Sequence, residues 1–150
     1  NHERVQLGVE RVDTLTTGHF LDRFSAISFR DCKILTSKNG QLTYRRWEFP
    51  DSNRRKNAQY NWWDNFGEDK ISLTWFSSTK ISKEATLILF NARSIIEIQG
   101  QKNIETSKWI EYQKTFYPKD SICYLLVQAL GSKCQWYKRT SSNTIELCKP

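Results

Sequence analysis

Short stretches in which apolar and polar residues alternate at a spacing of two recur along most of the chain, and this pattern predicts half-buried β-strands. The stretch 41–49, QLTYRRWEF, shows the pattern well. Successive side chains of a strand point to opposite faces, so Thr43 and Arg45 share one face with Trp47 and Phe49. We expect this face to be the inner one near the end of the strand, because it carries two aromatic rings.

The same pattern, bounded by turn-forming residues, predicts the other strands. They are expected over 19–27, 28–36, 71–77, 85–91, 94–99, 108–117, 122–130 and 133–138. No helical pattern alternates with these stretches, which argues against a parallel α/β sheet. About eight evenly spaced strands joined by short hairpins predict an all-β fold, either a meandering antiparallel barrel or a sandwich.

Two turn signals fix the ends of predicted hairpins. Asn39 and Gly40 readily take the positive φ values of a hairpin turn between the strands over 28–36 and 41–49. Gly131 and Ser132 predict the turn of the last hairpin. Four aliphatic residues near the N-terminus have roughly helical spacing, which allows a short helix there: Val5, Val9, Val12 and Leu15.

The stretch 50–69 is the longest one without a strand pattern. It mixes turn-forming residues with four aromatic residues: Tyr60, Trp62, Trp63 and Phe66. Long loops in compact domains are often lids, binding loops or disordered segments, and the four aromatics argue against disorder. Two interpretations stay open: the aromatics cap the core beneath the loop, or they form the mouth of a binding cavity.

Composition narrows the class of protein. The 150 residues suffice for one domain with its own core, over 1–150, and 6 Trp predict an aromatic-rich interior. No run approaches the ~18 apolar residues of a membrane span.

The net charge of +7 and the basic cluster Arg54, Arg55 and Lys56 leave open a surface module that binds a protein or an anionic polymer. No RNA-binding signature is present, so nucleic acid is not an expected partner.

The four cysteines, an even number without a CxxC pair, favour disulfides over a metal site. They are Cys32, Cys123, Cys134 and Cys148. Disulfides form outside the reducing cytosol, so we expect a secreted protein whose precursor carried a secretory signal. Four cysteines allow three pairings, and the residues alone do not choose among them.

Residues for catalysis are scarce. Only His2 and His19 are present, which leaves no histidine dyad and no multi-histidine metal site. No phosphate-binding glycine loop and no nucleophile motif occurs. We therefore expect no enzymatic activity, no cofactor and no bound metal. Glu48, Glu97 and Glu111 lie within predicted strands, where an inward carboxylate would suit a cationic amine and an outward one would be solvated.

Three short motifs each contain a cysteine: RDCKIL over 30–35, SICYLLV over 121–127 and KCQWYK over 133–138. They resemble, in this order, an early cysteine-bearing strand, a later one and the cysteine and tryptophan strand that follows it in the lipocalins of tick saliva, the group that includes the histamine-binding proteins. Cys148 fits the terminal cysteine of that family. The basic charge is similar to that of the Japanin-like immunomodulators in this group. The general lipocalin glycine-x-tryptophan signature is missing near the first strand.

The resemblance implies an eight-stranded antiparallel up-and-down lipocalin barrel. It also implies disulfides between Cys32 and Cys148 and between Cys123 and Cys134. A tight turn at Gly131 and Ser132 would instead place Cys134 opposite Ala129, so the second pair requires a looser connection or another pairing.

By the same resemblance the chain is expected to be a secreted, monomeric carrier that modulates host immune or inflammatory responses. Its barrel would hold a sterol, such as cholesterol, or a lipid mediator. Alternate strand residues would line the cavity: Trp47, Phe49, Trp75, Phe90, Tyr112, Leu125, Val127 and Trp136. Two other functions stay open, a scavenger of histamine or serotonin and the basic surface module, which would bind a host protein.

Overall fold

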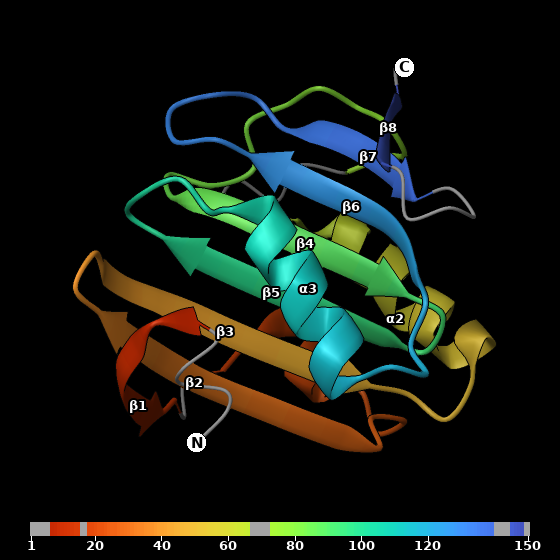
Figure 1. Cartoon of the computed structure of the whole chain (residues 1–150). Helices are drawn as coiled ribbons and strands as arrows, with labels where there is room; N and C mark the ends of the chain where they lie inside the picture. Colours follow the sequence, from red (N-terminus) through yellow and green to blue (C-terminus); the bar gives the residue numbers. More distant parts are fainter. Residues whose placement is uncertain (1–6, 16–17, 67–72, 140–144, 149–150) are drawn as a thin grey trace.

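The computed structural model describes residues 7–15, 18–66, 73–139 and 145–148 (Figure 1). The elements follow in the order β1 (Val9–Thr14), η1 (Phe20–Arg23), β2 (Phe29–Ser37), β3 (Gly40–Glu48), α2 (Ser52–Asp64), β4 (Ala85–Asn91), β5 (Ser94–Gly100), α3 (Thr106–Phe116), β6 (Ile122–Gln128), β7 (Gln135–Arg139) and β8 (Ile145–Cys148). All described strands join one antiparallel sheet, as the alternation of residues predicts.

The strand order is β1-β2-β3-β5-β4-β6-β7-β8. The expected up-and-down order is therefore wrong at the β4–β5 hairpin, where β5 and not β4 lies next to β3. Helix α2 explains the exchange, because it leads the chain from β3 to a strand two positions away in the sheet. Among the described residues β1 pairs only with β2 and β8 only with β7, so the ladder of hydrogen bonds is open.

The two helices cover opposite faces of the sheet (Figure 1). Trp62 and Trp63 of α2 join one apolar cluster, and Trp109 and Tyr112 of α3 join the other. Strand β4 is buried along its whole length, because both of its faces are covered. Near-continuous apolar sequences such as ATLILFN are typical of strands buried on both faces.

Two segments that were predicted to be other structures are helices. The stretch 108–117 lies within α3, and its prediction as a strand is wrong: Trp109, Tyr112 and Gln113 are buried at helical spacing. The stretch 50–69, predicted to be a loop, contains α2. The helix begins after Pro50 because the side chain of Asp51 accepts a hydrogen bond from the backbone N–H of Arg54.

The N-terminal prediction of a helix is also wrong over the described residues 9–14, which form β1. The expected strand over 19–27 is replaced by η1, whose first turn is capped by the side chain of His19. Of the expected strand over 71–77, residues 71–72 lie outside the described ranges and 73–77 are not a strand. Phe76 takes a positive φ of 62°, which interrupts an extended chain.

The first hairpin forms at the predicted place, but its two turn residues are Lys38 and Asn39, and of the predicted pair Asn39 and Gly40 only Gly40 has a positive φ among the described residues. Ser37 pairs with Gly40 across a turn of two residues, and Gly40 has the positive φ of 120° that glycine takes without strain. The last hairpin also forms, with a longer connection between β6 and β7. Of the helices in the described ranges, none is long and apolar enough to cross a membrane.

Candidate functional site

A pocket of about 170 Å3 opens on the α3 face of the sheet, at the end where β2 turns into β3. Its apolar wall combines residues from the segment before β1, from β1, β2 and β3, and from the β5–α3 loop and α3. They are Leu7, Val9, Leu35, Leu42, Ile104 and Trp109. Polar residues form the rest of the lining: Asn39, Gly40, Gln41, Gln101, Lys102, Asn103, Glu105 and Lys108. An apolar wall with a few polar groups at its edge is the usual composition of a small-molecule site.

The wall of the pocket is held in place by packing behind it. The indole of Trp109 is buried and stacks on the ring of Tyr44 with 5.7 Å between ring centroids. Tyr112 packs against the same indole edge-on, at 5.4 Å. The β5–α3 loop is anchored by Asn103, whose side-chain oxygen accepts a hydrogen bond of 2.7 Å from the backbone N–H of Leu130.

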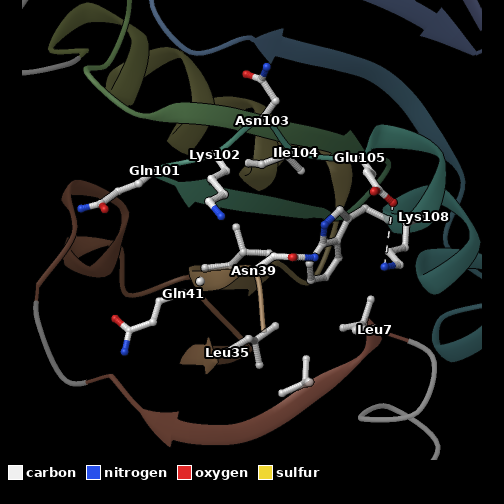
Figure 2. Close-up of a pocket in the computed structure, with 14 residues that line it drawn as sticks. Leu7, Leu35, Asn39, Gln41, Gln101, Lys102, Asn103, Ile104, Glu105 and Lys108 are labelled. Carbon is white, nitrogen blue, oxygen red and sulfur yellow. Dashed lines mark ion pairs between the residues drawn. The ribbon is translucent and has the colours of Figure 1, made fainter. Parts of the chain in front are cut away.

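The charges at the pocket edge favour an anion. Glu105 and Lys108 form an ion pair of 3.8 Å, drawn as the dashed line in Figure 2. Lys102 has no ion pair with any residue in the described part of the chain. Figure 2 shows its side chain extending toward the middle of the group, while Gln41 and Gln101 point away from it. One positive charge is therefore available to a bound molecule.

The opposite, α2 face contains the larger aromatic cluster. The indole of Trp63 packs against Trp75, Phe90 and Trp136, with centroid distances of 4.7, 5.6 and 5.5 Å. The indole N–H of Trp136 donates a 2.9 Å hydrogen bond to the carbonyl of Ser77. These rings contact one another directly, so they form a packed core beneath α2.

The eight cavity residues proposed from sequence do not gather around one site. Five of them belong to the α2-face cluster: Trp47, Phe49, Trp75, Phe90 and Trp136. Three belong to the α3 face: Tyr112, Leu125 and Val127. None of the eight is among the residues that line the α3-face pocket. Strand alternation divides them between the two faces, and Tyr112 is on a helix.

The three carboxylates considered for amine binding already have partners. Glu97 is buried, and its carboxylate lies 3.3 Å from Nε2 of His19 and 3.2 Å from a guanidinium nitrogen of Arg45. Burial raises the pKa of Glu97, but His19 and Arg45 outweigh it and hold the pKa below its ordinary value. Glu48 pairs with Arg46, and Glu111 is an exposed residue of α3 that pairs with Lys114.

The basic cluster predicted as a surface module is divided by the fold. Arg55 is buried and donates hydrogen bonds to Gln59 and to the carbonyl of Ala92. Trp62 and Trp63 are buried as well. Three of the four aromatics of this segment therefore cap the core, whereas Tyr60 is exposed, and only part of the proposed patch faces solvent.

All four cysteines lie in the described ranges, and none of them forms a disulfide. Strands β2 and β8, which carry Cys32 and Cys148, are separated by five other strands in the sheet. The pairing of Val127 with Gln135, continued by one residue, places Cys134 opposite Gln128. Cys123 is then five residues away along β6, or roughly 17 Å. The pairing that the resemblance implies is not formed in this structure.

Sequence reasoning missed the pocket for a physical reason. Its lining comes from elements far apart in the chain, including an α-helix that was predicted to be a strand. The signal that could have found α3 was the spacing of Trp109, Tyr112 and Gln113, which fits one face of a helix.

Among the described residues no group of three or more His, Cys, Asp or Glu side chains could hold a metal ion.

No model of a known protein family, no curated protein and no solved structure matches this chain. The resemblance to tick lipocalins therefore stays a prediction.

Proposed function

We infer that the chain is a carrier of a small amphipathic ligand, which binds in the α3-face pocket with its apolar part inward and an anionic head toward Lys102. The observation that carries this proposal is the combination of the apolar wall with the ammonium of Lys102 at the edge, which has no ion pair within the described ranges. A carboxylate head would form a charge-assisted hydrogen bond with that ammonium.

The volume of the pocket limits the ligand. At about 170 Å3 it lies below the roughly 300–1,000 Å3 of sites for drug-sized molecules. The pocket would hold a short-chain amphiphile entirely, or one end of a longer fatty acid, lipid mediator or sterol. It lies between the sheet and α3, so the proposal does not depend on closure of the sheet into a lipocalin barrel.

The partners of the acidic residues support an anionic ligand over histamine or serotonin. A buried ammonium needs a carboxylate partner, because an uncompensated buried charge costs several kcal/mol. Glu97 is the one buried carboxylate among the described residues, and Arg45 and His19 already occupy it.

The biological setting is part of the same proposal. Secretion and modulation of host immune or inflammatory responses follow from the resemblance to tick lipocalins. The carried ligand would then be a host lipid mediator. Native mass spectrometry of the purified protein, with organic extraction, would test whether such a molecule copurifies.

Calorimetric titration with hexanoate, octanoate and decanoate tests the site. Each added methylene contributes about 0.8 kcal/mol on burial, so affinity should rise about fourfold per methylene until the pocket is full. Ile104→Trp, which places an indole in the pocket, should abolish binding. Trp75→Phe on the α2 face is the matched control and should leave it unchanged. Loss of binding in Trp75→Phe alone would place the ligand on the α2 face and contradict the proposal.

A further inference from the structure

Two cysteines near the C-terminus lie on the same face of the sheet, Cys148 in β8 and Cys134 directly before β7. Cys148 of β8 is paired with Trp136 of β7, so both side chains point to the α2 face. Cys134 precedes Trp136 by two residues and belongs to the same buried cluster. Residues i and i+2 of an extended chain share a face, so Cys134 and Cys148 are diagonal neighbours.

We propose that Cys134 and Cys148 are a redox-responsive pair, which an oxidant converts into a disulfide that fastens the edge strand β8 to the sheet. Diagonal neighbours of antiparallel strands have Cα atoms about 7–8 Å apart, and a disulfide needs no more than about 7 Å. The two Cα atoms must therefore approach by roughly 1 Å. This is a small movement for a four-residue strand that, among the described residues, pairs with β7 alone.

The environment of the two thiols sets the order of the reaction. Cys148 is half-buried, whereas Cys134 is buried and its thiol donates to the carbonyl of Ser77, 3.3 Å away. Burial raises the pKa of both thiols, so the reaction should speed up as pH rises toward their pKa values.

The oxidant required is a small-molecule disulfide such as oxidised glutathione. The Cys148 thiolate attacks one of its sulfurs, which forms a mixed disulfide and releases one glutathione thiolate. The Cys134 thiolate then attacks the Cys148 sulfur and releases the second glutathione. Two protein thiols are oxidised to one disulfide, and one glutathione disulfide is reduced to two thiols.

Tryptic digestion separates all four cysteines, which makes the pairing unambiguous. They fall in the peptides 31–33, 120–133, 134–138 and 140–150. The folded, reduced chain is incubated with oxidised glutathione at pH 8.5 and mapped without reduction. The expected product joins 134–138 to 140–150, and it should also form in the double variant Cys32→Ser, Cys123→Ser.

The same oxidation of the chain unfolded in urea is the control. In the unfolded chain the loops from Cys123 to Cys134 and from Cys134 to Cys148 differ little in length, so the product that joins 134–138 to 140–150 should no longer dominate. A folded-state product that joins either peptide to 31–33 or 120–133 would overturn the proposal, as would glutathione adducts without an internal bridge. Once the bridge has formed, exchange should slow at least tenfold at those backbone amides of β8 whose N–H donates to β7, which in an antiparallel ladder is every second residue. Unchanged exchange would overturn the fastening of β8.

Discussion

Nε2 of His19 lies 3.4 Å from Oε2 of Glu97, although the two residues are 78 positions apart in the chain. The backbone N–H of Leu21 donates to Nδ1 of the same ring, which leaves Nε2 to carry the proton toward Glu97. The ring also packs on Trp47 with 4.4 Å between centroids. Through these contacts His19 fastens the segment around η1 to the α2 face of the sheet.

Glu97→Gln should lower the free energy of unfolding by about 3 kcal/mol at pH 7, because it leaves Arg45 and His19 without their carboxylate. The pKa of Glu97 is lowered in the folded protein, from an ordinary value of 4.5. Its contribution is therefore complete above pH 4.5 and is lost as the pH falls below that. Urea unfolding should show a smaller difference in the free energy of unfolding between wild type and Glu97→Gln below pH 4 than at pH 7.

Glu111→Gln is the control for that comparison, since Glu111 is an exposed carboxylate on α3. Its effect on stability should stay within about 0.5 kcal/mol at both pH values. If the free energy of unfolding of Glu97→Gln differs from that of the wild type by the same amount at both pH values, the charge of Glu97 is not what stabilises the fold.

Arg46→Met should cost about 3–5 kcal/mol in the free energy of unfolding. The Arg46 side chain is fully buried, and it donates hydrogen bonds to Glu48, Asp120 and Gln113. Its guanidinium also lies 3.5 Å from the ring centroid of Tyr117. Loss of the guanidinium leaves Asp120 without its ion-pair partner and removes the hydrogen bond that joins Gln113 of α3 to β3.

Arg54→Met serves as the reference, because Arg54 is an exposed residue of α2. Thermal and urea unfolding should show Arg54→Met within about 0.5 kcal/mol of the wild type. Equal stability losses in the two variants would rule out Arg46 as the anchor of α3.

Gly100→Ala should destabilise the chain by about 1 kcal/mol, because a Cβ at this position would lie 2.5 Å from Cδ2 of Leu42, which must move, and 3.3 Å from the backbone oxygen of Gln41. Gly18→Ala is the matched control: nothing lies within 4 Å of its Cβ position. Adding Leu42→Ala to Gly100→Ala should recover part of the loss, measured as a double-mutant cycle in urea. A purely additive cycle would place the strain elsewhere.

Lys102→Met should weaken decanoate binding by about 0.2–1 kcal/mol, the usual range for an exposed ion pair. Decanol, which has the same chain without the charge, should bind both proteins equally. Lys102→Arg should retain most of the affinity for decanoate, and Lys56→Met on α2 should retain all of it. A proportional loss for decanol and decanoate would assign Lys102 a packing role.

The strands with the clearest alternation or the longest apolar runs were predictable, as 41–49 and 85–91 show. Asn39 and Gly40 also identified their turn, because turn geometry depends on local residues. The exchange of β4 and β5 depends on where α2 crosses the sheet, and no local pattern records that.

The site was less predictable than the fold for the same reason. Trp109 was predicted in a strand because its neighbours include several strand-forming residues, yet the packing of Trp109 and Tyr112 on Tyr44 makes the segment a helix. Trp47 and Trp75 were chosen as alternate residues of predicted strands, and alternation does not say which face of the sheet carries a pocket. They pack under α2, whereas the pocket lies on the other face.

The six tryptophans provide the most direct test of the proposed carrier function. A nitrogen–proton correlation NMR spectrum of the 15N-labelled chain contains one indole signal for each of them, and Trp109→Phe identifies the signal of Trp109. Titration with decanoate should shift that signal and leave those of Trp63, Trp75 and Trp136 in place. Shifts confined to these three α2-face indoles, or no shift at saturating decanoate, would contradict binding in the α3-face pocket.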